Sequence, residues 1–191
     1  MQFSLFGAEA ADPVLEDLDG LLLAGGAWVR NGDGSAARLS VLVAEQWRVD
    51  ALRAEFAARS LASDTAPAPG ELIAVRTEFT GALSGHAARW TVGASVRAPA
   101  QLSLTASALR LWALAAGKID DAGYLLLMDA PDPVLHRRAG GELARLGVAA
   151  VDVGVRIGPG WRVTSARRLR RLAELVGEAP PGAAGDWPLG D

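Results

Sequence analysis

Few side chains in this sequence have the spacing that catalysis needs. Ser84 and His86 lie two residues apart, but a serine nucleophile also needs an orienting acid and the G-x-S-x-G turn, which is absent. Two histidines and no cysteine leave no ligand set for structural zinc. Four glutamates form either a carboxylate cluster for a divalent cation or a solvated face: Glu45, Glu55, Glu71 and Glu78.

Phosphate-binding loops are also missing. The sequence has no G-x-x-x-x-G-K-[ST] and no G-x-G-x-x-G followed by an acid, so it lacks the usual signatures of nucleotide-binding enzymes. We therefore expect no catalytic residue, no metal and no cofactor.

Arginines are concentrated near the end of the chain. In the segment 161–176 the leucines form one stripe of a helix and the arginines spread over the opposite side. One interpretation is a solvated basic face paired with Glu174 or Glu178, and the other is contact with phosphates, for which the planar guanidinium is suited. The candidate nucleic-acid-binding residues, with the tryptophan as a stacking surface, are Trp161, Arg162, Arg167, Arg168, Arg170 and Arg171.

Periodicity and turn signals predict the elements that must position these residues. Helices are expected at 13–24, 46–61, 105–118, 132–147 and 164–177. A hairpin is expected around the turn NGDGS, with further strands at 71–79, 88–96, 123–129 and 148–155. The segments 62–70 and 80–87, Lys118 to Asp121 and the turn GPGW are expected to be irregular.

The alternation of strands and helices after Gly117 predicts an α/β fold, with a mixed central sheet flanked by helices. We expect a docking peptide at 1–7, a single α/β domain at 8–177 and a flexible tail at 178–191. No repeat at the spacing of solenoid proteins is visible.

Composition narrows the possible partners. The 191 residues carry a net charge of -3, which argues against a generally basic nucleic-acid binder. A single lysine among 19 basic residues is typical of a GC-rich genome, so arginine abundance alone is no sign of phosphate binding. Neither a secretory signal nor a membrane-spanning run is evident, and we expect a cytoplasmic protein.

The first residues resemble the bacterial sliding-clamp-binding motif, usually Gln-Leu-Ser/Asp-Leu-Phe. The chain has Gln2, Phe3, Ser4, Leu5 and Phe6, with phenylalanine in place of the usual first leucine. The resemblance implies that Leu5 and Phe6 enter a hydrophobic cleft of the clamp while Gln2 orients the peptide. The alternative is that these apolar side chains pack on the protein's own core.

The order of elements over 12–155 resembles the PD-(D/E)XK nuclease fold. Active members of that family bind a divalent metal through acids on neighbouring strands and use a nearby lysine. This chain departs from the pattern, because RLSVLV contains no acid, Glu78 is followed by Phe79 and Thr80, and Lys118 follows a helix. The resemblance therefore implies a restriction-endonuclease-like topology without its catalytic set.

Together these features predict a non-enzymatic accessory protein of DNA replication or repair that docks on the sliding clamp and contacts DNA through its last helix. Two alternatives stay open: a divergent metal-dependent nuclease, and a structural interaction protein unrelated to DNA.

The clamp motif leads to a first prediction. Calorimetry should show micromolar binding of the purified protein to a bacterial sliding clamp, and the double substitution Leu5→Ala/Phe6→Ala should abolish it because both anchors are lost. Circular dichroism of the variant tests whether it stays folded. Undiminished binding by a folded variant would contradict the docking role of these residues.

Overall fold

The computed structural model describes residues 11–92, 95–96, 99–129, 132–154, 158–183 and 185–188. Gln2, Phe3, Leu5 and Phe6 lie outside these residues, so the clamp motif stays a prediction. No helix in the described part of the chain is long and apolar enough to cross a membrane.

The described chain consists of two halves with the same order of elements. The first half contains η2 (Leu15–Leu18), α1 (Asp19–Leu23), β1 (Ala27–Arg30), β2 (Ala37–Val43), α2 (Gln46–Ala58), β3 (Ser63–Ala68), β4 (Leu72–Thr77), η3 (Gly81–Leu83) and α3 (Ser84–Trp90). The second contains α4 (Ala106–Ala116), β7 (Gly117–Asp120), β8 (Gly123–Leu127), α5 (Pro133–Arg145), β9 (Val151–Asp152), β10 (Gly160–Val163) and α6 (Ala166–Val176). The short pair β5 (Thr91–Val92) and β6 (Ser95–Val96) lies between the halves.

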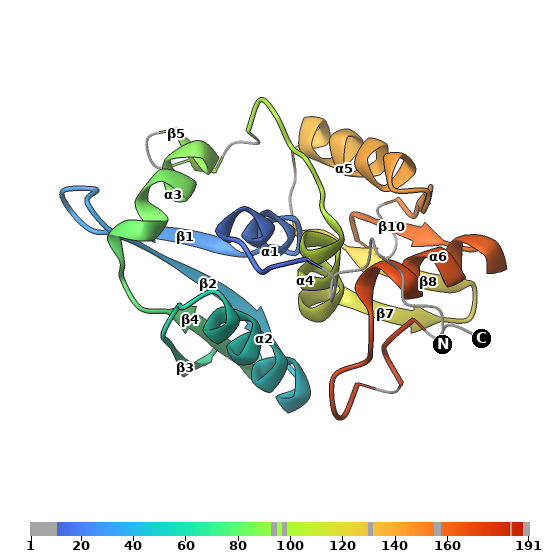
Figure 1. Cartoon of the computed structure of the whole chain (residues 1–191), viewed down its shortest axis with the longest axis horizontal. Coiled ribbons are helices and arrows are strands. Elements are labelled where there is room, and N and C mark those ends of the chain that lie inside the picture. Colours follow the sequence, from blue (N-terminus) through green and yellow to red (C-terminus); the bar gives the residue numbers. More distant parts are fainter. Residues whose placement is uncertain are drawn as a thin grey trace.

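Each half builds one antiparallel sheet. The strand order is β1-β2-β4-β3 in the first sheet and β7-β8-β10-β9 in the second, so the two orders correspond strand by strand. Figure 1 shows the sheets on either side of the central helices α1 and α4, with α2 on the first sheet and α5 and α6 beside the second.

The strand registers correspond as well. Ser40 lies opposite Ala27 on one side and Arg76 on the other. Leu125 lies between Lys118 and Arg162 in the same way. Arg76 and Arg162 therefore occupy equivalent positions in the two sheets. The sequence hides this repeat because other equivalent residues are chemically different, such as Ala27 and Lys118, or Ser40 and Leu125.

The α/β class with flanking helices is confirmed, and most expected elements form. The hairpin β1–β2, the strands β4 and β8, and the helices α2, α4, α5 and α6 lie where the sequence predicted them. Thr105, Asp132 and Ser165 cap their helices by accepting backbone N–H bonds.

The prediction of one mixed central sheet is wrong. The described strands form antiparallel pairs in two sheets, and three of these strands were not predicted. The segments predicted as irregular contain β3, β7 and β10, so each strand pairs with an antiparallel neighbour. Pro67 lies on the edge strand β3, where a missing N–H costs no ladder bond. Further differences are that α3 covers residues expected to form a loop and a strand, and that β9 has only two residues.

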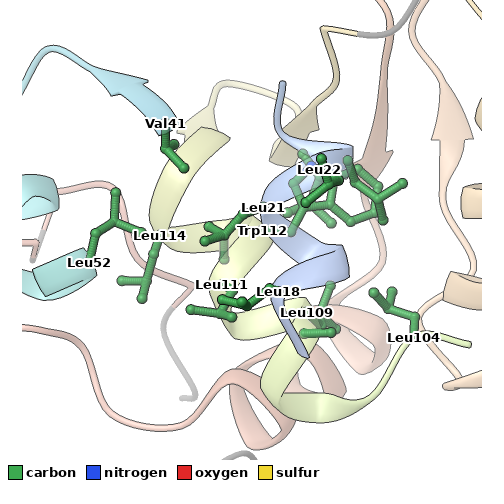
Figure 2. Close-up of a cluster of buried hydrophobic side chains, with 14 of the residues drawn as sticks. Leu18, Leu21, Leu22, Val41, Leu52, Leu104, Leu109, Leu111, Trp112 and Leu114 are labelled. Carbon is green, nitrogen blue, oxygen red and sulfur yellow. The ribbon is translucent and has the colours of Figure 1, made fainter. Parts of the chain in front are cut away.

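The two halves join where α1 crosses α4. A Cβ atom placed on Gly20 would lie 1.8 Å from the carbonyl oxygen of Ala108, so only glycine allows this approach. Buried leucines of both helices surround the contact, together with Trp112, which is fully buried (Figure 2). Val41 and Leu52 extend the cluster into the first sheet and α2, so both halves share one hydrophobic core.

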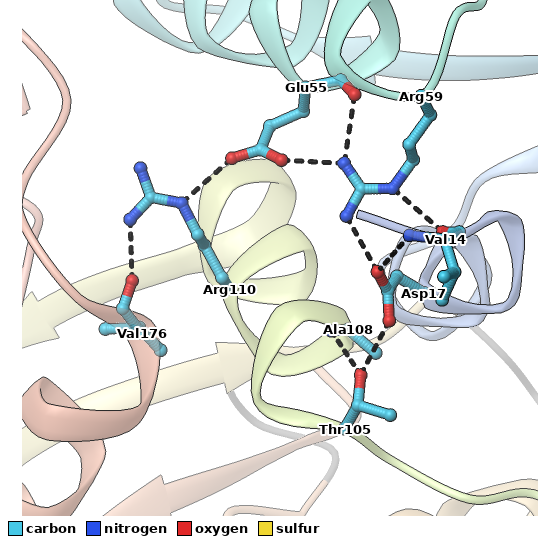
Figure 3. A network of polar contacts seen from close by, with 8 residues as sticks. All are labelled: Val14, Asp17, Glu55, Arg59, Thr105, Ala108, Arg110 and Val176. Carbon is cyan, nitrogen blue, oxygen red and sulfur yellow. Dashed lines mark hydrogen bonds and ion pairs between the residues drawn. The ribbon is translucent and has the colours of Figure 1, made fainter. Parts of the chain in front are cut away.

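A buried polar network fixes the start of the first helical segment (Figure 3). The segment begins at Leu15 rather than at 13, and Asp17 accepts the N–H of Val14, so Asp12 is not its cap. Arg59 donates to Asp17 at 2.9 Å and to Glu55 at 2.7 Å, and the Asp17 and Arg59 side chains are each only 2% exposed. Thr105 donates its hydroxyl to Asp17 and thereby ties α4 to the same carboxylate.

Arg110 of α4 connects the second half of α2 to the last helix, α6. Arg110 donates to Glu55 at 2.9 Å and to the backbone oxygen of Val176 (Figure 3). It also donates to the backbone oxygen of Glu178. At the other end of α4, Arg48 donates to the carbonyl groups of Ala113, Leu114 and Gly117. Ala113 also accepts the backbone N–H of Gly117, whereas Leu114 lies in the last turn of the helix, where carbonyl groups lack helical partners, so the guanidinium helps to complete the helix end.

The described part of the segment 178–191 packs on the domain, which corrects the expectation of a flexible tail there. Trp187 is 1% exposed and donates its indole N–H to the carbonyl of Gly177 at 2.9 Å. The guanidinium of Arg110 lies 5.3 Å from the centre of the same ring. Burial of a large aromatic side chain explains why this glycine- and proline-rich stretch is held.

The helix crossing leads to a prediction about stability. Gly20→Ala should lower the free energy of unfolding by about 1–3 kcal/mol, because the added methyl group meets backbone atoms that cannot move aside. Gly141→Ala in α5 is the matched control: nothing lies within 4 Å, and alanine should raise stability by up to about 1 kcal/mol. Urea denaturation measures both, and equal stability of Gly20→Ala and the wild type would contradict the crossing.

The buried network leads to another. Arg59→Met should cost about 3–5 kcal/mol, because it leaves the Asp17 carboxylate buried without its charge partner. Arg76→Met breaks the more exposed pair with Asp64 and should cost much less, because solvent screens that pair. Unfolding in guanidinium chloride measures the free energy of unfolding of both variants. A similar decrease in the two would contradict a larger contribution of the buried Arg59 pair.

Candidate nucleic-acid interface

Helix α6 packs on α4 through one face and leaves the other face open. Leu172, Leu175 and Val176 are buried and Leu169 is partly buried, which confirms the predicted apolar stripe. Ser165 accepts the N–H of Arg168 at the start of the helix. The arginines therefore extend from the open side of a helix that the core holds in place.

Three of these arginines have no partner among the residues that the structure describes. The side chains of Arg167, Arg168 and Arg170 are exposed and make no hydrogen bond or ion pair there. Arg171 is half-buried: it pairs with Glu174 at 3.1 Å, as one interpretation of the sequence expected, and donates to the carbonyl of Leu146. The surface formed by Arg167, Arg168, Arg170 and Arg171 is called the α6 arginine face below.

The α6 arginine face borders two adjoining hollows that share Gly147 and Arg167. One has a volume of about 340 Å³ and is also lined by Arg170, Arg171 and Glu174. The other has a volume of about 480 Å³ and is also lined by Ala149, Ser165 and Arg168. Four guanidinium groups face one carboxylate here, and the helix N-terminus adds partial positive charge. This arrangement favours a polyanion that offers several phosphate groups.

The other two candidate residues lie elsewhere. Trp161 packs on α5, where a Cβ on Gly140 would lie 2.4 Å from the indole ring. Its ring stacks on His136 with centroids 4.7 Å apart. This packing covers part of the half-buried ring, and the role of Trp161 as a stacking surface stays a prediction. Because side chains alternate along a strand, Arg162 lies on the opposite face of the sheet.

On that face Arg162 forms an ion pair with Asp120, and the hydrogen bonds from the guanidinium lower the pKa of the carboxyl against the effect of burial. The equivalent arginine of the first sheet, Arg76, holds Asp64 in two hydrogen bonds of 2.8 and 3.0 Å. Both outward-facing arginines are thus neutralised by an aspartate. Lys118 lies on the second sheet, exposed and unpaired within the described residues.

Arg38 and Arg76, which were not among the predicted candidates, lie on the outer face of the first sheet. In β2 the buried residues Leu39, Val41 and Val43 alternate with Arg38, Ser40 and Leu42. This period of two was the signal that could have identified an outward-facing arginine.

The residues considered for catalysis are not assembled into a site. The Ser84 hydroxyl donates to the carbonyl of Gly81 at 2.8 Å, and His86 Nδ1 is buried without a partner. Glu45 and Glu55 are paired with arginines. Among the described residues no group of three or more His, Cys, Asp or Glu side chains is placed to hold a metal ion.

No protein-family model and no curated protein matches this sequence. Solved structures do resemble the fold. The homing endonuclease I-WcaI bound to its DNA recognition sequence aligns with a TM-score of 0.65 and 11% identity, over 84% of this chain and 79% of that one.

Two WhiA structures also align, each at 12% identity. Full-length DUF199/WhiA from Thermatoga maritima gives a TM-score of 0.59 over 86% of this chain, which spans only 55% of that protein. The N-terminal LAGLIDADG domain of DUF199/WhiA gives 0.56, over 88% of this chain and 83% of that one. These neighbours replace the PD-(D/E)XK topology that the order of elements suggested.

The word LAGLIDADG spells nine residues in one-letter code. The segment 18–26 reads LDGLLLAGG and has the same residue at the first, third, fourth, seventh and ninth positions. Leu23 and Gly25 stand where the word has aspartates. In the second half, Leu114 and Ala116 occupy the corresponding places before Gly117. The chain thus has a fold similar to that of I-WcaI and of the WhiA LAGLIDADG domain, without acids at these positions.

Proposed function

We propose that this protein binds DNA without cleaving it and that the α6 arginine face contacts the phosphate backbone. The observation that carries the proposal is the group of exposed, unpaired arginines at Arg167, Arg168 and Arg170, beside two hollows that also expose the start of α6. Phosphate contacts by arginines and helix N-termini supply most of the non-specific affinity of proteins for DNA.

The structural neighbours support the choice of ligand. One of them is a homing endonuclease bound to its DNA recognition sequence, so a chain of this fold is compatible with a DNA complex. At 11–12% identity the likeness concerns the fold, and the binding surface must be argued from this chain's own side chains.

The charge distribution favours the α6 arginine face over the sheets. On the sheets Arg76 and Arg162 are paired with Asp64 and Asp120, so a phosphate there would have to displace a bound carboxylate. Arg38 and Lys118 make no ion pair within the described residues, but they lie on different sheets and form no cluster. On α6 only Arg171 has an acidic partner. A phosphate group on α6 can therefore interact with guanidinium groups that have no acidic partner, so it does not have to replace an existing ion pair.

The residues at the ends of α1 and α4 support binding without cleavage. Metal-assisted cleavage of a phosphodiester needs carboxylate ligands, because Mg²⁺ prefers hard oxygen donors. Leu23, Gly25, Leu114 and Ala116 have no such oxygen in their side chains. A divergent nuclease would have to use carboxylates placed elsewhere.

A role in replication or repair through the sliding clamp is the finer part of this proposal. It depends on Gln2, Phe3, Leu5 and Phe6 alone, and the calorimetric experiment tests it independently of DNA binding. An interaction protein unrelated to DNA is the remaining alternative, and the absence of DNA binding would favour it.

The proposal predicts a salt-dependent affinity for duplex DNA. Arg167→Ala/Arg168→Ala/Arg170→Ala should weaken binding similarly for all sequences and reduce the slope of log K against log salt by up to about 3, since each lost phosphate contact removes about 0.9. Fluorescence anisotropy with a labelled duplex at several salt concentrations measures both quantities.

Arg76→Ala/Arg162→Ala is the control, since it removes arginines that already have acidic partners. It should change the slope little. A loss of affinity in this control with unchanged binding by the α6 variant would place the DNA on the sheets instead. Incubation of the duplex with Mg²⁺ should leave it intact, and cleavage would support the nuclease alternative.

A further inference from the structure

One acidic side chain lies in the row of arginines on α6. Arg167, Arg170, Arg171 and Glu174 have helical spacing, so they share one side of α6, and they line the same hollow of about 340 Å³. Glu174 is in the last turn of the helix. With a rise of about 1.5 Å per residue, it lies about 10 Å along the helix axis from Arg167. The hollow therefore has one end with cations only and one end with a carboxylate.

Glu174 holds one of the arginines in place. Its carboxylate accepts a hydrogen bond from Nη1 of Arg171 at 3.1 Å. The Nε atom of Arg171 donates to the carbonyl of Leu146, at the end of α5. Two nitrogens of this guanidinium are thus engaged within the protein. Arg171 is therefore less free than Arg167 or Arg170 to donate to a phosphate group.

The stability of α6 does not explain a glutamate at this position. An acid in the last turn faces the negative end of the helix dipole. A glutamate also stabilises a helix best when it precedes the basic residue, whereas Glu174 follows Arg170 by four residues and Arg171 by three. The Glu174 side chain is 55% exposed, and an ion pair in solvent contributes little to folding. We therefore expect its main effect in the hollow that it lines.

The carboxylate opposes phosphate binding in this hollow in two ways. It accepts a hydrogen bond from Arg171 that a phosphate oxygen would otherwise accept, and its negative charge repels the phosphate. The adjoining hollow, at the start of α6, has no acidic side chain among its described lining residues, which include Ser165, Arg167 and Arg168. At that end of the helix a phosphate interacts with guanidinium groups and meets no competing carboxylate.

We propose that Glu174 determines where phosphate groups bind on the α6 arginine face and limits how tightly they bind. This inference rests on the proposed function. Glu174 is a positioning residue: it keeps Arg171 in an internal pair, so that the nucleic-acid backbone is contacted by Arg167, Arg168 and Arg170. The carboxylate thereby keeps the number of phosphate contacts, and with it the affinity, below what four free arginines would provide.

The test is an anisotropy titration of the full chain with a labelled DNA duplex at several salt concentrations. Glu174→Gln should bind about fivefold more tightly at low salt, because a repulsive charge is removed. The slope of log K against log salt should increase by about 0.9, the value for one further phosphate contact, because Arg171 is released. In the double variant Glu174→Gln/Arg171→Ala this increase in slope should be absent.

Glu78→Gln is the matched control, because it changes the net charge of the protein by the same amount. Glu78 is exposed and follows β4 of the first sheet, whereas α6 lies beside the second sheet (Figure 1). Its DNA affinity and salt slope should equal those of the wild type. Glutamine has nearly the size of glutamate, so both variants should unfold at the temperature of the wild type.

Three results would overturn the role of Glu174 and leave the proposed function intact. The first is unchanged affinity and slope in Glu174→Gln while Arg167→Ala/Arg168→Ala/Arg170→Ala binds more weakly. The second is an equal gain in Glu78→Gln, which would show an effect of net charge alone. The third is a slope increase that persists without Arg171. If the wild type does not bind duplex DNA at any salt concentration, the proposed function and this inference both fail.

Discussion

The crossing of α1 and α4 at Gly20 is the constraint on which the rest of the structure depends. Because the Gly20 Cα lies against the carbonyl of Ala108, each helix becomes part of the other half's core. Each half contributes a sheet that could not bury its apolar face alone, and the paired helices fill the space between the two sheets. This contact leaves the outer faces of both sheets as separate surfaces.

Arginine has two physical roles in this molecule. Arg48, Arg59 and Arg110 are buried or half-buried and bind carbonyl groups and carboxylates at helix ends, so their charges are used inside the domain. Arg167, Arg168 and Arg170 extend from a helix whose apolar side is buried, and no described group opposes them. Solvent-facing charge without a partner, rather than arginine content, separates a candidate binding surface from a structural contact.

The two halves share a backbone plan but differ in their exposed side chains. Arg76 and Arg162 keep equivalent positions with an aspartate partner, whereas Val29 and Asp120 differ at equivalent positions. Burial constrains the inner residues of both sheets to be apolar, whereas outer residues such as Val29 and Lys118 are exposed and less constrained. The outer faces therefore became chemically distinct, as expected when one fold carries two different surfaces.

Local signals in the sequence predicted most of the helices and the strands with mainly apolar residues, such as β2, β4 and β8. Caps such as Thr105, Asp132 and Ser165, and the apolar stripe of α6, depend on residues a few positions apart, so they could be read directly. The strands β3, β7 and β10 could not, because polar and small residues such as those of SDTAPA become strands only when a neighbouring strand accepts their hydrogen bonds. The same holds for the candidate sites: the sequence identified the α6 arginines, but only the tertiary structure packed Trp161 against α5 and paired Arg162 with Asp120. Which face of a strand meets solvent, and which charge finds a partner, depends on residues far apart in the chain.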